Sequence, residues 1–273
     1  MEQNKHIQAL ELDKVLQMLA KETTCEDARQ LALQIQPSFG LYEVKLQLQE
    51  TDDAYMLMGR FGSPSFGSFH SVTNALRRAE AGGMLTMKEL LSIAEGLRVL
   101  RSLTEWRKRS IGVETSIDWR FEALSPNKYL EDRITQAIVS EEEMSDHASQ
   151  ALADIRRKIR AASSRVREQL DKMVRSPSYQ KYLQDPIVTI RDGRFVVPVK
   201  AECRGEVPGL VHDTSSSGAT VFVEPMGVVE ANNDIKVLKS KEEAEIERIL
   251  MELSVEAGSF SDSIIQGYQA AVE

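Results

Sequence analysis

Side chains that could perform covalent chemistry gather between His212 and Gly218. The segment reads HDTSSSG, so a histidine and an aspartate precede three serines. A nucleophilic serine needs a strained strand-to-helix turn with flanking glycines, whereas these serines separate two β-like runs, where small polar residues favour a turn. We interpret the segment as a hairpin loop. The alternative is that the chain is a hydrolase that uses these side chains. In that case Ser216→Ala and His212→Ala would each abolish its activity.

Other motifs for catalysis or cofactor binding are absent from the sequence. Neither GxxxxGK[ST] nor GxGxxG occurs. The histidines are scattered, and none lies at metal-ligand spacing from another histidine or a cysteine. Cys25 and Cys203 are far apart and favour free thiols over a disulfide. We therefore predict no catalytic, cofactor-binding or metal-binding residue in this chain.

Cationic side chains are the remaining candidates for function. Residues 154–175 carry eight lysines and arginines against three acidic residues, a net charge of +5 within a chain whose net charge is −8. A local basic stripe can bind phosphate although the whole chain is acidic. The alternative is a solvated helix face whose acidic partners lie on a neighbouring helix. From this stripe we predict Arg156, Arg157 and Arg160 as nucleic-acid-binding residues.

A second group of cations belongs to the β-rich segment that follows. Arg191, Arg194, Lys200 and Arg204 stand there against three acidic residues. Together with backbone donors in turns, such side chains can hold phosphate oxygens without reading bases. We predict these four as nucleic-acid-binding as well. The alternative is a hairpin whose charges keep its edges soluble.

The segment from Ile187 to Pro225 must position the second group, and it is the one part of the chain without a helical pattern. Asp192-Gly193 between β-branched runs predicts a two-residue hairpin. A second pair of runs, 209–211 and 220–223, is joined by the polar loop 213–218. Pro198 and Pro208 lack a backbone donor and are expected at edges or strand ends.

Long helices are predicted on both sides of this β segment. The first is expected from about 141 to 183, capped by Ser140 with Glu143 and broken at Ser176-Pro177. Its apolar residues alternate three- and four-residue steps, as in a coiled-coil seam; they are Leu152, Ile155, Ile159, Ala162, Val166, Leu170 and Met173. A comparable seam follows Pro225, so we predict antiparallel pairing of the two helices.

The first 125 residues predict a bundle of shorter helices. Capping boxes are expected at Thr23 with Glu26 and at Thr86 with Glu89, and Ser125-Pro126 is expected to open a further helix. Two sets of residues at helical spacing are predicted to face inward; they are Leu41, Val44, Leu48 and Tyr55, and Leu90, Ile93, Leu97 and Leu100.

Composition places the chain among ordinary soluble proteins. Hydrophobic residues make up 42% and charged residues 28% of the 273 positions, so disorder is not expected. No apolar run approaches the ~20 residues of a membrane span. The N-terminus lacks the apolar region of a signal peptide, so a cytoplasmic location without membrane contact is expected. Because helical pattern continues to the last residue, we expect a fragment.

The segment YLQDPIVTIRDGRFVVPVKAECRGEVPGLVHDTSSSGATVFVEPMGVVEANNDI closely resembles the clamp region of the type-two bacterial MutS paralogues. HIQALELDKVLQMLA, IRRKIR and EIERILMELS fit the same family. The resemblance implies a mainly α fold: a helical core bundle, long antiparallel coiled-coil lever helices, and a small antiparallel β clamp at their tip. The expected ranges are 1–125 for the core, 126–184 for the ascending lever, 185–225 for the clamp and 226–273 for the descending lever.

The resemblance also implies what the longer proteins do. They carry an ABC-type ATPase, which uses ATP and Mg²⁺, and a nuclease-like domain, and they form homodimers. The family is associated with branched DNA and suppression of recombination, and with collided ribosomes that are split using ATP. No ATPase or nuclease motif is present here, so this chain is expected to be no enzyme itself. We expect a clamp that binds DNA or ribosomal RNA; the alternative is a structural lever and dimerisation scaffold without nucleic-acid affinity.

Overall fold

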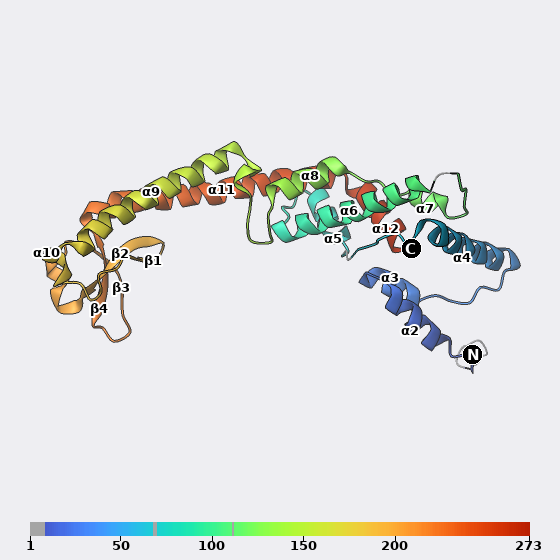
Figure 1. The fold of residues 1–273 in the computed structure, drawn as a ribbon, viewed down its shortest axis with the longest axis horizontal. Coiled ribbons are helices and arrows are strands. Elements are labelled where there is room, and N and C mark those ends of the chain that lie inside the picture. Colours follow the sequence, from blue (N-terminus) through green and yellow to red (C-terminus); the bar gives the residue numbers. More distant parts are fainter. Residues whose placement is uncertain (1–8, 68–69, 111) are drawn as a thin grey trace. The chain divides into compact units, whose positions relative to one another are not determined.

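The computed structural model describes residues 9–67, 70–110 and 112–273, so the histidine at position 6 lies outside the described residues. The chain is mainly helical with one small antiparallel sheet (Figure 1). Its α-helices are α2 (Leu12–Glu22), α3 (Glu26–Leu33), α4 (Leu41–Phe61), α5 (Thr73–Glu80), α6 (Met87–Arg109), α7 (Asp118–Glu122), α8 (Lys128–Ala137), α9 (Gln150–Arg175), α10 (Pro177–Gln180), α11 (Val229–Ser259) and α12 (Ser261–Val272).

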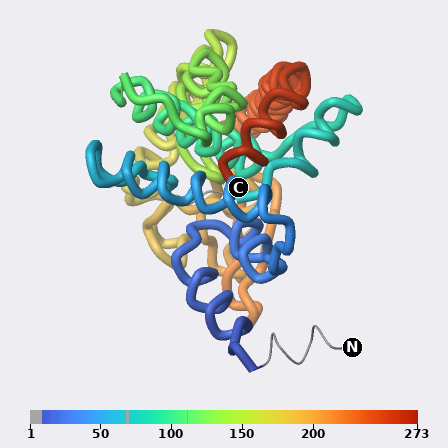
Figure 2. The backbone as a smooth tube through the Cα atoms, turned by 90° about the vertical axis from the view of Figure 1, so that its right-hand side faces the viewer, coloured from blue at the N-terminus to red at the C-terminus, as the bar shows by residue number. Residues whose placement is uncertain are grey.

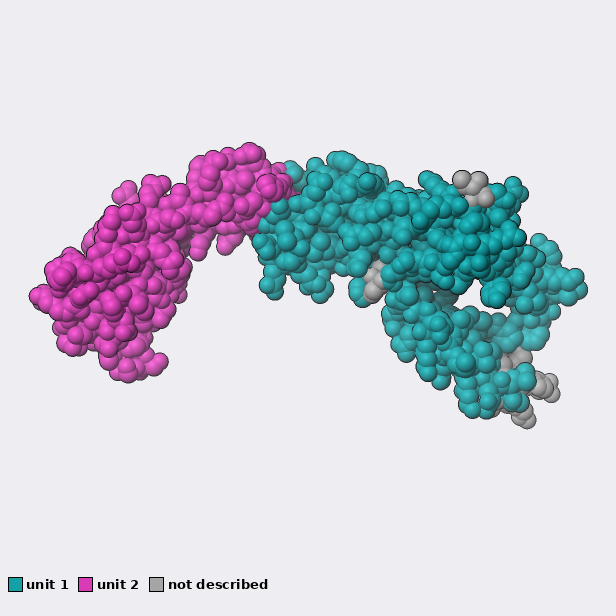
Figure 3. All heavy atoms as spheres, viewed as in Figure 1, with its two compact units in different colours: residues 1–145, 250–273 teal, residues 146–249 magenta. Residues whose placement is uncertain are grey.

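Two compact units divide the chain (Figure 3). Unit 1 comprises residues 1–145 and 250–273, and unit 2 comprises residues 146–249. This division groups residues differently from the ranges expected from the sequence. Residues 126–145 belong to unit 1 because α8 packs on α6, and the last 24 residues of the chain belong there too.

Helix α6 is the central element of unit 1. Its predicted capping box is confirmed, because Thr86 accepts from the backbone of Glu89 and Glu89 accepts from the backbone of Thr86. The predicted inward residues of this helix are also confirmed; Leu90, Ile93, Leu97 and Leu100 are all buried. Beside them, the buried Glu131 of α8 pairs with Arg98 and Arg101 of α6, which fixes the two helices in register.

Three predicted helix starts are wrong, and in each case another residue caps the helix. Cys25, not Thr23, accepts from the first turn of α3, while the Thr23 hydroxyl donates back to Ala20. Asn127 caps α8 two residues after Ser125. Ser149 caps α9 nine residues after Ser140, because residues 138–145 form a turn closed by a bridge between Ile138 and Met144.

The predicted inward face of α4 is wrong as well. Leu41, Leu48 and Tyr55 are exposed and Val44 is half-buried. The buried side of this helix carries Asp53 and Leu57 instead. Helices α2 and α3 pack on each other as a pair (Figure 2), and they too leave apolar side chains in solvent.

In unit 2, α9 and the first part of α11 run antiparallel. Ser149 at the start of α9 donates to Glu245, while Gln169 near its end donates to the carbonyl of Gly227, just before α11. The predicted break at Ser176-Pro177 is confirmed, because α9 ends at Arg175 and α10 begins at Pro177.

The sheet of unit 2 has the order β1-β2-β4-β3 and is antiparallel throughout. The strands are β1 (Thr189–Arg191), β2 (Arg194–Lys200), β3 (Gly209–Thr214) and β4 (Thr220–Pro225). The predicted hairpin is confirmed, since Asp192 and Gly193 both have positive φ, as a type I′ turn requires. Pro198 lies inside β2 but beyond the end of its pairing with β1 at Val196, so its missing donor interrupts no β1–β2 hydrogen bond, as expected for an edge position.

The core of unit 2 joins one face of this sheet to the helices. Val197 and Val199 of β2 and Val221 and Val223 of β4 alternate along their strands and face the same side. They cluster with apolar residues of α9 and α11, among them Val166, Leu170 and Ile235. The sheet is thereby attached to both helices through one apolar layer.

Candidate nucleic-acid interface

Several cations of α9 lie together on one helix without acidic partners among the described residues. Lys158, Arg165, Arg167 and Arg175 are exposed, and none forms an ion pair with any other described residue. Among the described residues, Arg156 is the one α9 cation that forms an ion pair with α11, through Glu242. The solvated-face alternative required acidic partners on a neighbouring helix, and for most of these cations α11 supplies none.

Part of this charge lines a groove between α9 and α11, here called the α9–α11 groove. Its basic rim consists of Arg157, Lys158 and Arg165 from α9 and Lys241 from α11, and Asp234 is its one acidic lining residue. Between the rims lie small and aliphatic side chains: Ala161, Ala162, Val237 and Leu238. The groove is therefore a shallow trough with three cations on its α9 side and one lysine and one aspartate on its α11 side.

The three residues predicted on this helix differ in how freely they can bind a ligand. Arg156 is largely buried and lies between Asp146, at 2.7 Å, and Glu242, at 2.6 Å. Burial lowers the pKa of Arg156, but the hydrogen bonds to the two carboxylates outweigh it and raise that pKa overall. Arg157 and Arg160 are exposed and pair with Asp154 and Asp146, respectively. Arg157 and Arg160 thus remain accessible, whereas Arg156 joins α9 to α11.

Two of the predicted cations on the sheet hold the sheet together. Arg191 pairs with Asp213 at 3.1 Å and stacks over the ring of Phe222 at 4.0 Å. Arg194 is 16% exposed and donates to Glu224 and to Asn233. Both belong to the sheet face opposite the valines of the core. Arg191 retains an exposed edge, whereas the Arg194 guanidinium is occupied.

The other two predicted cations on this part of the chain lie outside that cluster. The Lys200 ammonium donates to the carbonyl of Lys181. Arg204 is exposed in the short 3₁₀ segment η2 (Ala201–Glu206). The structure therefore does not gather the four predicted residues at one point.

A buried polar network was missed by sequence reasoning. The fully buried carboxylate of Glu224 accepts from Arg194 and Asn232, and it bonds the His212 ring at 2.5 Å. A β-bulge at His212, between Val211 and Asp213, turns that ring toward Glu224. One signal was available in the sequence: Asn232 lies three residues before Ile235 on the apolar stripe of its helix.

This network and the neighbouring hairpin engage the side chains that a Ser/His/Asp site would use. His212 is bonded to Glu224 rather than to a serine, and Asp213 accepts from Thr214 and pairs with Arg191. The hydroxyl of Ser215 accepts from Thr220 within the hairpin loop. Among the described residues, no cluster of three histidine, cysteine or acidic side chains is suited to a metal ion.

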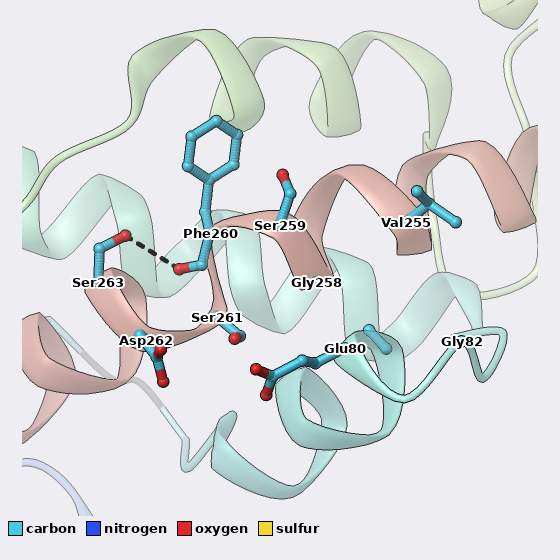
Figure 4. A pocket seen from close by; sticks show the side chains of 10 residues that line it. Glu80, Gly82, Val255, Gly258, Ser259, Phe260, Ser261, Asp262 and Ser263 are labelled. Atoms are coloured by element: carbon cyan, nitrogen blue, oxygen red, sulfur yellow. Dashed lines mark hydrogen bonds between the residues drawn. The ribbon is translucent and has the colours of Figure 1, made fainter.

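One further hollow lies in unit 1, at the break between α11 and α12 (Figure 4). Ser259 and Ser263 line it together with Glu80, and Gly258 sits so close to Ala79 that a Cβ there would come within 2.8 Å of backbone. Arg77 pairs with both Glu80 and Asp262 beside it. With its two carboxylates already paired and no histidine, cysteine or lysine in its lining, this hollow has no catalytic constellation.

Among the residues that the structure describes, no helix combines the length and apolar character needed to cross a membrane. No protein-family model matches the chain. Curated proteins match the chain. It is 43% identical over 263 residues to Endonuclease MutS2 of Acetivibrio thermocellus and 39% identical over 272 residues to Endonuclease MutS2 of Clostridioides difficile. These alignments cover 95% and 97% of this chain but 33% and 34% of the relatives. The chain is thus homologous to these proteins and spans about a third of their length.

Proposed function

We infer that this chain is part of a MutS2-type protein and that its unit 2 binds the phosphate backbone of nucleic acid. The observation that supports this proposal is the set of exposed α9 cations that lack acidic partners. Two further facts agree with it: α11 adds Lys241 to the rim of the α9–α11 groove, and the relatives are named endonucleases, which act on nucleic acid.

The arrangement suits contact with phosphate rather than recognition of bases. Lysine and arginine side chains along an exposed helix meet a polyanion at many points and release its counterions. Between its rims the groove presents aliphatic side chains, and Asp234 is the one residue of its lining whose side chain could accept from a base edge. We therefore propose binding governed by backbone shape and charge, as branched DNA and structured ribosomal RNA both allow.

Fluorescence anisotropy with a labelled four-way DNA junction and a labelled RNA hairpin tests this proposal. Titrations over a salt series give the slope of log K against log salt, which is about −0.9 per phosphate contacted in duplex DNA. Lys158→Glu, Arg165→Glu and Lys241→Glu combined should weaken binding at least tenfold and reduce the slope by about 3.

The matched control carries the same change in charge on unit 1. Lys45→Glu, Lys108→Glu and Lys128→Glu alter three exposed lysines away from the groove. This control should bind within about twofold of the parent chain. Equal weakening in both triple variants would show that only net charge matters, and the absence of binding at low salt would contradict the proposal.

A structural scaffold remains the second candidate, and one observation favours it. Arg156, Arg191 and Arg194 are bound to carboxylates of the chain itself, which gives them a structural role. In this case unit 2 would transmit movement as a lever without touching nucleic acid. Reversal of the free α9 cations would then leave every binding measurement unchanged.

The wider activity of a MutS2-type protein is also a proposal for this chain. We propose that it works within a homodimer whose ATPase and nuclease lie outside these residues. ATP hydrolysis, with Mg²⁺ as its cofactor, would supply the energy for movement of unit 2. The sequence has no loop suited to hold a nucleotide phosphate, so no residue of this chain is assigned to ATP.

A further inference from the structure

The α9–α11 groove exposes apolar side chains between the cations that would meet a polyanion. Val237 is 54% exposed, and Ala161 is exposed as well. Ala162 and Leu238, which line the groove with them, are half-buried. None of these side chains can form a hydrogen bond with a phosphate or a sugar. We call these four residues the groove floor.

A nucleic-acid duplex would leave the groove floor without a partner. Its bases are stacked on one another inside the double helix, so the surface that rests on a protein helix outside its grooves consists of sugars and charged phosphates. Aliphatic side chains gain nothing from contact with such groups. A single strand differs, because the apolar faces of its bases are accessible and every base has one.

We propose that the α9–α11 groove holds a single strand of DNA, with bases against the groove floor and phosphates at the cations of the rims. This inference rests on the proposed function, because it names the form of nucleic acid that unit 2 binds. Contact between base faces and the floor removes apolar surface of both partners from water, which is favourable. The contact tolerates any sequence, since it uses base faces rather than base edges.

The positions of the rim cations suit a flexible strand. Lys158 and Arg165 are seven residues apart, so they lie on the same side of α9 about 10 Å from each other along the axis. Lys241 lies on the opposite rim, on α11. A duplex has fixed phosphate positions, whereas a single strand can adjust its extension until its phosphates match these charges. A positively charged groove that follows the backbone is common in proteins that bind single strands.

The groove floor favours DNA over RNA. Each ribose carries a 2′-hydroxyl, and a hydroxyl that loses water without gaining a hydrogen bond is unfavourable. The floor has no acceptor for it, and Asp234 is the one acidic residue of the groove lining. Thymine adds a methyl group that can pack on aliphatic side chains. We therefore assign the groove to DNA.

Fluorescence anisotropy with the full chain tests this assignment. Three labelled probes of equal length are compared at the same salt concentration: oligo(dT), oligo(rU) and a DNA duplex. Counterion release favours the duplex, because it contributes about 0.9 per phosphate contact against about 0.7 for single strands. We nevertheless expect oligo(dT) to bind at least fivefold more tightly than the duplex and at least threefold more tightly than oligo(rU).

A change of the groove floor separates contact with bases from contact with phosphates. Ala161→Asn with Val237→Asn replaces the two exposed floor residues and keeps the net charge. It should weaken the binding of oligo(dT) at least fivefold and leave that of the duplex within about twofold. Ala151→Asn with Ala244→Asn is the matched control, because both alanines are exposed on the same two helices outside the groove lining. The control should bind both probes as the parent chain does.

The outcomes distinguish this inference from the proposed function. Equal affinity for oligo(dT) and the duplex would overturn the inference, and so would equal weakening of both probes by the floor variant. Binding of oligo(rU) as tight as that of oligo(dT) would overturn the assignment to DNA. In these cases the proposed function stands if Lys158→Glu, Arg165→Glu and Lys241→Glu combined still weaken binding. The absence of binding to every probe at low salt would overturn both.

Discussion

Asn232 forms three side-chain hydrogen bonds in the buried network of unit 2. It is 1% exposed, its amide group donates to Phe195 O and Glu224, and its carbonyl accepts from Phe195 N. The side chain thus binds the backbone of β2 as another strand would, and it ties α11 to the sheet. Removal would leave two backbone groups and a buried carboxylate short of partners.

We expect Asn232→Ala to lower the free energy of unfolding of unit 2 by about 2–4 kcal/mol, since unpaired buried polar groups cost about 1–3 kcal/mol each. Urea unfolding followed by circular dichroism measures the change. Asn233→Ala is the matched control, because that neighbour is exposed and accepts one bond from Arg194; it should cost less than about 1 kcal/mol. Equal losses in the two variants would contradict this role of Asn232.

At the scale of elements, Glu245 connects α9 with α11. Hydrogen bonds from Arg248 and then Ser149 lower the Glu245 pKa to about 2, although burial opposes them. Its ordinary value is 4.5. A carboxylate with a lowered pKa in the folded state contributes stability above pH 4.5 and loses that contribution as the pH falls toward 2.

The free energy of unfolding of Glu245→Gln should therefore lie below that of the parent chain by on the order of 1 kcal/mol at pH 7. The gap should close as the pH falls from 4.5 to 2. Urea unfolding at pH 7, 4 and 2.5 follows it, with the exposed Glu243→Gln as the control on the same helix. A gap that stays constant over this range would show that the carboxylate charge is not involved.

Elements also show what sequence could and could not predict. The Asp192-Gly193 hairpin and the Thr86 capping box were predicted correctly because a few adjacent residues determine them. The start of α9 was not predicted correctly, because several serines precede it and a tertiary contact with Glu245 selects Ser149. Glu224 was missed because its partners come from 8, 12 and 30 residues away.

The candidate interface was predictable only in part, for the same reason. The positive charge of residues 154–175 is visible in the sequence. The sequence does not show which of these cations stay free, because their pairing depends on where α11 places its carboxylates. Glu242 occupies Arg156, while Lys158 and Arg165 have no such partner among the described residues. The exposed apolar residues of α4, Leu41, Leu48 and Tyr55, were mispredicted for a related reason: periodicity predicts that a helix face is apolar, but not what covers it.

At the scale of the whole molecule, the two compact units have separate cores. The core of unit 2 contains Val166 and Leu170 of α9, whereas Leu100 and Leu103 of α6 belong to a cluster in unit 1. Both tryptophans of the chain, Trp106 and Trp119, belong to unit 1. Tryptophan fluorescence therefore reports on unit 1 alone, while circular dichroism reports on the helices of both units.

We expect Ile159→Asp with Val166→Asp to separate these two signals. Val166 belongs to the unit 2 core, where a charge costs several kcal/mol, and Ile159 is half-buried on the same helix, so the helix signal at 222 nm should lose part of its amplitude at a lower urea concentration. The fluorescence transition should keep its midpoint, because neither substitution touches the core of unit 1. Lys158→Asp with Arg165→Asp, on the exposed side of the same helix, is the control and should shift neither transition appreciably. If the variant with both aspartates moved both midpoints together, the chain would unfold as one cooperative body, and the two units would not be independent in stability.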